Sequence, residues 1–294
     1  MSCAVTVAVT AGSAAWRPAL ALSFNAFVWG VSWWPLRQLQ GAGLHPLWAT
    51  ALVYIVPVLL IALRSPRACG ELLRTPSLWL LVLAAGTTNA SFNWAMTIGD
   101  VVRVVLLFYL MPLWAVLLAR VLLGEHFSAI ALLRVALALT GAVVVMWPAD
   151  GGLPLPRSLA DGLALLGGFS FALNNVMLRR EAARSTGARA LAMFLGGALV
   201  SAALALALST APPPALASGW VLGALALSFA FLVGNLALQY GAARLPANAT
   251  AVIMITEVLF ASGSALLLGA GVLTPALAAG GVLIVLAALL ATRG

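Results

Sequence analysis

Charged side chains are scarce in this 294-residue sequence, which contains no lysine, seven acidic residues and two histidines. They make up 7% of the chain, whereas soluble globular domains carry about 25%. So few charges cannot cover the water-exposed surface of a protein of this size. The hydrophobic content of 64% and the mean hydropathy of +1.12 therefore indicate that most of the chain lies in lipid.

Cysteine is nearly absent as well. Cys3 and Cys69 lie far apart and belong to no CxxC or Cys/His cluster, so the sequence predicts neither a zinc site nor a disulfide framework. The arginines fall singly or in small groups between apolar runs and form no basic helix, which argues against nucleic acid as a partner. We expect no cofactor and no metal.

Long apolar runs are abundant, and they set the expected fold. A helix that crosses a bilayer needs about 20 mostly apolar residues. The runs of this length are 19–39, 45–63, 77–99, 102–122, 128–147, 159–178, 187–208, 218–241, 247–268 and 274–292. The sequence therefore predicts an all-α integral membrane protein with ten transmembrane helices.

The arginines also predict the orientation of these helices, because cytoplasmic loops are enriched in positive charge. With the N-terminus inside, three arginines lie near outer loops, namely Arg37, Arg103 and Arg157. The inside set is larger and comprises Arg17, Arg64, Arg67, Arg74, Arg120, Arg179, Arg180, Arg184, Arg189, Arg244 and Arg293. We expect residues 1–18 to form a cytoplasmic tail, because they lack the basic n-region of a signal peptide, and the C-terminus to be cytoplasmic too.

The two halves of the chain show weak internal similarity. FVWGVSWWPLR (27–37) can be aligned with FSFALNNVMLR (169–179), and the Pro/Gly-rich stretch 148–158 separates the halves as a linker. The predicted domains are therefore two five-helix repeats, 19–147 and 159–292. Because each repeat has an odd number of spans, the two must be inverted, which places a substrate path at the midplane between them.

This organisation resembles a known family. The Trp29-Gly30 pair in the first span and the segment YLMPLWAVLLARVLLGE (109–125) are similar to the drug/metabolite transporter superfamily, EamA branch, and within it to bacterial aromatic amino acid exporters. The resemblance implies a multi-pass protein of the bacterial inner membrane. It also implies a secondary transporter, not an enzyme, that exports small metabolites by alternating access.

Polar side chains at membrane depth are the candidate substrate contacts. An amide left bare in hydrocarbon costs several kcal/mol, so each one either bonds a neighbouring helix or lines a wet cavity. Both interpretations stay open for any single residue, and for the group we favour the cavity. The expected substrate-contacting amides are Asn25, Asn89, Asn93, Asn174, Asn175, Asn235 and Gln239.

Aromatic residues and one acid complete the expected site. Trp29, Trp33 and Tyr109 lie deep in spans, where their faces suit flat or apolar groups and an ammonium; core or lipid-facing packing is the alternative. Glu257 is the one acid deep within a span. It is either a proton-linked or amino-contacting carboxylate, or a structural acid held by hydrogen bonds. Pro112, beside Tyr109, is the predicted hinge of the first repeat.

Pairs of glycines predict close contacts between helix backbones. They are Gly219-x-x-x-Gly223, Gly167-Gly168, Gly196-Gly197 and Gly280-Gly281.

Neutral and aromatic amino acids are the expected substrates, and other metabolites such as drugs, nucleosides or nucleotide sugars are the alternative. Phosphorylated substrates would need basic residues in the cavity, whereas most arginines lie at the cytoplasmic edge. An integral-membrane enzyme is the alternative of another class. It would need clustered intramembrane His, Asp or Ser/Lys groups, and the sequence has two separated histidines.

The arginine distribution yields a direct test of topology. It places loops 40–45, 148–158 and 209–217 outside, so the variant Gly152→Cys should react with a membrane-impermeant thiol reagent in intact cells. Protection of this cysteine from the reagent would reverse the predicted orientation.

Overall fold

The computed structural model describes residues 16–124, 129–147, 155–216, 219–242, 244 and 247–290, and its regular elements there are all helices. Most of the expected tail (1–15) and linker (148–154) lie outside these residues. The helices are α1 (Trp16–Val31), α2 (Trp33–Gly41), α3 (Pro46–Arg64), α4 (Pro66–Arg74), α5 (Pro76–Ile98), α6 (Val101–Phe108), α7 (Met111–Leu123), α8 (Ala129–Met146), α9 (Leu159–Arg180), α10 (Thr186–Ala207), α11 (Trp220–Ala242), α12 (Ala247–Leu267) and α13 (Pro275–Leu290).

Two of the predicted spans are each divided into a pair of helices. The run 19–39 breaks at Ser32, whose hydroxyl donates to the Trp29 carbonyl at 2.8 Å, and Pro35 has no N–H with which to continue the ladder. The run 102–122 breaks after Phe108, where Pro112 likewise lacks the N–H that would bond the carbonyl four residues earlier. Proline chemistry thus places both breaks.

The described helices overlap all ten predicted runs, but not all of them meet the length of a span. Five segments are long and apolar enough to cross a membrane, or six if α4 and α5 are taken as one bent pair. Shorter apolar helices cover 135–146, 253–267 and 275–287. The fold is therefore a helical, multi-span one, while the count of ten crossings stays a prediction.

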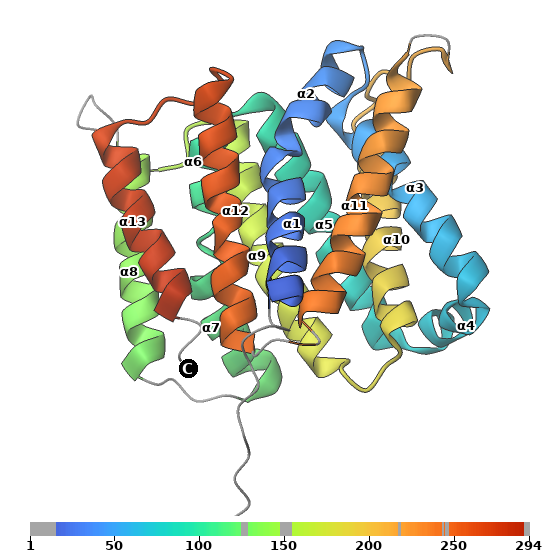
Figure 1. Ribbon diagram of the computed structural model, residues 1–294, viewed down its shortest axis with the longest axis horizontal. Helices are drawn as coiled ribbons and strands as arrows, with labels where there is room; N and C mark the ends of the chain where they lie inside the picture. Colours follow the sequence, from blue (N-terminus) through green and yellow to red (C-terminus); the bar gives the residue numbers. More distant parts are fainter. Residues whose placement is uncertain are drawn as a thin grey trace, which may run out of the picture.

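Helices from the two halves of the sequence interleave in space. In Figure 1, α1 stands between α11 and α12, and both of these helices contact it. Helix α5 contacts α9 and α10 in the same way, and α8 pairs with α13 at one edge of the bundle. If each helix is replaced by its predicted equivalent in the other half, every pair named here corresponds to a pair of helices in contact. For example, the pair α1 and α11 corresponds to the pair α9 and α5. The pattern is compatible with an inverted repeat, and the division into two repeats remains a prediction.

Glycines set the spacing of several helices, as Gly167-Gly168 and Gly196-Gly197 predicted, whereas the prediction for Gly219 was wrong, because a Cβ there would meet nothing within 4 Å. A Cβ atom on Gly196 would fall on the carbonyl oxygen of Val82, and one on Gly86 would fall on the carbonyl of Gly196. A Cβ on Gly168 would lie 2.5 Å from the Phe108 carbonyl oxygen. Helices α5 and α10, and likewise α6 and α9, therefore touch backbone to backbone.

An ion pair ties three helices at the end of the bundle that holds α2. Arg103 donates to both carboxylate oxygens of Asp161, from Nε at 2.7 Å and from Nη2 at 2.9 Å. Its Nη1 donates to the Val145 carbonyl at 2.7 Å. This bidentate contact holds α6 and α9 together with the end of α8.

Gly196→Ala should lower stability, because its methyl group has no room between α5 and α10. We expect a loss of about 1–3 kcal/mol, typical of overpacking, seen as a lower melting temperature of the purified protein. Gly263→Ala is the matched control, since a Cβ there meets nothing within 4 Å. Equal melting temperatures for the two variants would contradict the close contact.

Candidate functional site

A cavity of about 420 Å³ lies in the middle of the bundle, with walls from both halves of the chain. Its polar lining consists of Asn25, Thr88, Asn89, Asn174, Asn175, Asn235 and Glu257. Its aromatic lining consists of Trp29, Tyr54, Phe92, Phe108, Tyr109, Phe171, Phe194 and Phe231. The cavity is large enough for a small metabolite and offers both a polar and an apolar surface.

Most of the residues expected from the sequence meet at this cavity. They are Asn25, Trp29, Asn89, Tyr109, Asn174, Asn175, Asn235 and Glu257. The structure places Asn93 and Trp33 elsewhere, and the side chain of Gln239 lies outside the described part of the molecule. The expected hinge Pro112 falls one residue after the break between α6 and α7, and its side chain is not among those described.

Glu257 is the one charged side chain among the described lining residues. The Tyr109 hydroxyl donates to its Oε2 at 3.2 Å and lies 3.4 Å from the Met254 carbonyl oxygen, one turn earlier on α12. Among the described residues, no hydrogen bond occupies the other carboxylate oxygen. One oxygen is thus held by Tyr109, and the second is available to a ligand that donates hydrogen bonds.

Asn25 joins this cluster from α1. Its amide nitrogen lies 3.5 Å from the Met254 sulfur, and a Cβ on Gly234 would lie 3.3 Å from its oxygen. Glycine at 234 therefore lets α11 approach the buried amide. The side chains of Asn25, Tyr109 and Glu257 consequently share one corner of the cavity, around Met254.

Two groups of aromatic rings form the apolar walls. Trp29 stacks on Phe231 with centroids 4.5 Å apart, and Tyr54 lies 5.7 Å from the same ring. Phe108 packs against Phe92 at 4.5 Å and against Phe171 at 5.3 Å. Such surfaces accept flat or apolar groups, and their faces attract cations.

Some lining amides are already engaged within the protein. The Tyr54 hydroxyl donates to Asn89 Oδ1 at 2.6 Å, and Asn89 Nδ2 donates to the Ala85 carbonyl at 2.8 Å. Asn174 Nδ2 donates to Asn175 Oδ1 at 3.4 Å, a long contact that a ligand could replace. Asn89 is therefore the more rigid of these groups.

Asn93 and Trp33 have structural positions. Asn93 is fully buried and donates to Thr50 Oγ1 at 3.1 Å, which joins α5 to α3. Trp33 is also buried, and its Nε1 donates to Ser264 Oγ at 2.9 Å, which joins α2 to α12. Residues 85, 88, 89 and 92 of α5 line the cavity. Asn93 lies at the edge of this helix face and is turned toward α3.

Much of the aromatic wall was not predicted from the sequence. Tyr54 could have been found, because a tyrosine in the middle of an apolar span needs a partner for its hydroxyl. The phenylalanines gave no such signal. Phe24 and Phe27 face outward with 41% and 45% exposure, and nothing in their sequence context distinguishes them from Phe92 or Phe108.

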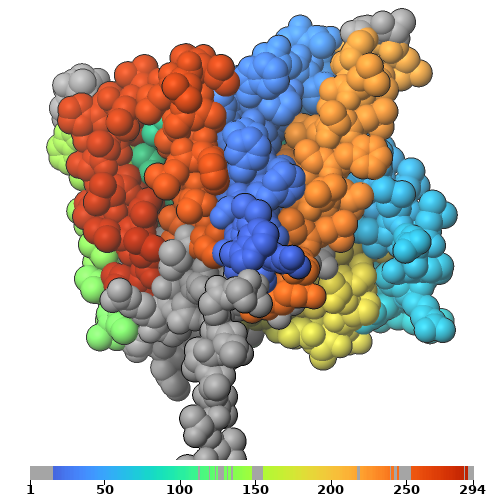
Figure 2. All heavy atoms as spheres, in the orientation of Figure 1, coloured from blue at the N-terminus to red at the C-terminus, as the bar shows by residue number. Residues whose placement is uncertain are grey.

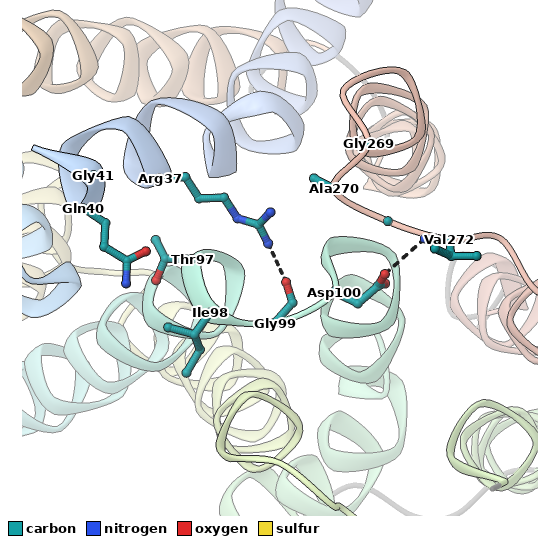
Figure 3. A pocket seen from close by; sticks show the side chains of 11 residues that line it. Arg37, Gln40, Gly41, Thr97, Ile98, Gly99, Asp100, Gly269, Ala270 and Val272 are labelled. Atoms are coloured by element: carbon teal, nitrogen blue, oxygen red, sulfur yellow. Dashed lines mark hydrogen bonds between the residues drawn. The ribbon is translucent and has the colours of Figure 1, made fainter. Parts of the chain in front are cut away.

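A second pocket of about 620 Å³ lies at the end of the bundle near α2 (Figure 3). Arg37 reaches from α2 to the end of α5, with Nε 3.1 Å from the Met96 carbonyl and Nη2 bonded to the Gly99 carbonyl. Asp100 Oδ2 accepts from the Val272 amide at 3.1 Å. Both charges here hold segments together, so the central cavity is the stronger candidate site.

The two pockets are separated along the first pair of helices. Trp29 lines the cavity, Arg37 lines the outer pocket, and Trp33 lies one turn from each. Its bond to Ser264 therefore joins α2 to α12 in the segment between the two pockets. Within the described residues, no group of three His, Cys, Asp or Glu side chains could hold a metal.

Part of the chain is similar to a family of transporters. Residues 16–147 match the EamA-like transporter family. The chain is 32% identical over 133 residues to the protein RarD of Salmonella typhi and to that of Salmonella typhimurium. Each match covers 44% of this chain and 42% of the relative. These matches, together with the apolar helices, make the chain a multi-pass membrane protein.

One solved structure has the same overall arrangement of helices. A crystal structure matches 94% of this chain and 96% of its own, with a TM-score of 0.57 and 21% sequence identity. At this identity the likeness concerns the fold alone.

The different positions of Asn235 and Asn93 lead to different expectations for replacement by leucine. Asn235→Leu should reduce ligand flux in proteoliposomes, because the residue lines the cavity. Asn93→Leu should lower the melting temperature by breaking the bond to Thr50, at a cost of about 1–3 kcal/mol. If Asn235→Leu transports at the parental rate, the cavity does not contact the substrate there.

Proposed function

We propose that the protein is a secondary transporter of small amphipathic metabolites, a proposal supported by the match of residues 16–147 to the EamA-like transporter family. The direction we propose is export, by alternating access through the cavity between the two halves. We place it in a bacterial inner membrane, as the family resemblance implies, with both termini in the cytoplasm, as the distribution of arginines predicts.

The lining of the cavity is the observation that carries this proposal. A single carboxylate, several amides and two groups of aromatic rings suit a molecule with one ammonium end and one flat or apolar end. Neutral and aromatic amino acids have this character. In this proposal the substrate ammonium binds Glu257 beside Tyr109, and its side chain packs against Trp29 and Phe231.

Other substrate classes fit the lining less well. Nucleotide sugars and similar phosphorylated compounds need cationic partners, and no arginine is among the described residues of the central cavity. Drugs and nucleosides share the aromatic character of the proposed substrates. A panel of amino acids, nucleosides and dyes, tested for flux in proteoliposomes, separates these alternatives.

The role of Glu257 decides how transport is driven. A proton-coupled carrier would use its carboxylate to exchange a proton between the two sides, whereas a facilitator would use it to bind the substrate ammonium. A proton path through the described cavity would consist of Glu257 and Tyr109 alone, which is thin support for proton coupling. We therefore propose facilitated transport, with Glu257 as a substrate contact.

Glu257→Gln should slow downhill flux of amino acids by roughly tenfold or more, because a charged hydrogen bond to the substrate becomes a neutral one. Accumulation of substrate in parental proteoliposomes should not respond to an imposed pH gradient. Glu181→Gln is a control, because this acid contacts Arg184 at the end of α9, away from the cavity. Gradient-driven accumulation that is lost in Glu257→Gln would instead establish proton coupling.

A further inference from the structure

Helix α4 has an orientation unlike that of the rest of the bundle. It lies across one end of the molecule, at 102° to α5, and Figure 1 shows it at the lower right, apart from the upright helices. With nine residues it is about 14 Å long, too short to cross a bilayer of about 30 Å. It connects two long apolar helices, α3 and α5, so its place is the boundary between lipid and water.

One face of α4 is bound to the protein. Ala68 and Leu72 are each 3% exposed and pack into a cluster with residues of α5, α9 and α10. The carboxylate of Glu71 accepts hydrogen bonds from the backbone amide and the hydroxyl of Ser185, just before α10. The one acid of this helix is thus used to attach it to the bundle.

The remaining faces of α4 are basic and apolar. Arg67 and Arg74 are exposed and lie two turns apart, on the same side of the helix, and the exposed Arg64 precedes it. Leu63 and Leu73 are exposed to 76% and 71%. Within the described part of the chain, none of these three arginines takes part in an ion pair.

We propose that α4 is an interfacial helix that binds anionic phospholipid, with its arginines on the lipid phosphates and Leu63 and Leu73 in the acyl region. A short helix with a basic face and one exposed leucine of its own, Leu73, has the features of a segment that lies in the membrane surface. Anionic lipid is the partner that its position and charge both favour, because the helix is held at the level of the headgroups and the three arginines of residues 64–74 outnumber the one acid there, Glu71. In Figure 2 this segment, in light blue, lies at the lower right edge of the molecule.

The test measures lipid bound to the full-length purified protein. After exchange into mixed micelles with phosphatidylglycerol or phosphatidylcholine, native mass spectrometry should show preferential retention of phosphatidylglycerol. Each arginine near an anionic surface strengthens binding about fivefold, so Arg67→Gln with Arg74→Gln should weaken this retention by about 25-fold. Circular dichroism and the melting temperature establish that the variants are folded.

Arg180→Gln is the matched control, because this arginine is exposed at the end of α9 and lies outside α4. If it weakens retention as much as the α4 variants do, the attraction comes from the whole basic end and the assignment to α4 is wrong. Equal retention of the two lipids would also overturn it. Competition by millimolar inorganic phosphate alone would show a site for free anions in place of a lipid surface.

Discussion

Hydrocarbon provides no hydrogen bonds, and this constraint governs the whole structure. Every backbone group at membrane depth must be satisfied within the protein, which permits helices and leaves polar side chains few places to lie. In the described bundle some bond a neighbouring helix, as Asn93 does to Thr50 and Ser228 to the Val53 carbonyl at 2.7 Å. Others bond a carbonyl of their own helix, as Thr97 does, or line the central cavity. The same requirement therefore produces both the interhelical contacts and the candidate site.

Close backbone contact makes that arrangement possible. Where Gly86 meets Gly196 and Gly168 meets Phe108, helices from the two halves approach without intervening side chains. Association in lipid depends on such contacts, because apolar side chains gain little by leaving hydrocarbon for another apolar surface. The long side chains are consequently directed away from these contacts. Many of the aromatic ones gather around the cavity, where they form its apolar walls.

The two helix breaks position the Tyr109–Glu257 pair and Trp29 at the site. The break after Phe108 allows Tyr109 to meet Glu257 of α12. The break at Ser32 separates Trp29, which lines the cavity, from Trp33, which bonds Ser264 of α12. A proline lies just after each break. The amphipathic α4 adds a third irregularity, and it keeps one end of the bundle at the membrane surface while the proposed site lies near its middle.

Composition and the length of the apolar runs were sufficient to predict a helical membrane protein, because both depend on the solvent and not on packing. The polar residues within those runs indicated much of the cavity, since an amide in lipid needs a partner whatever the fold. The polar residues did not predict how each helix is rotated about its own axis. Asn89 and Asn93 lie on neighbouring positions of one helix face, yet only the packing of α3 against α5 directs Asn93 to Thr50 and leaves Asn89 at the cavity. The phenylalanines of the wall were likewise assigned by tertiary structure alone, because a ring gains a similar burial from lipid as from a protein interior.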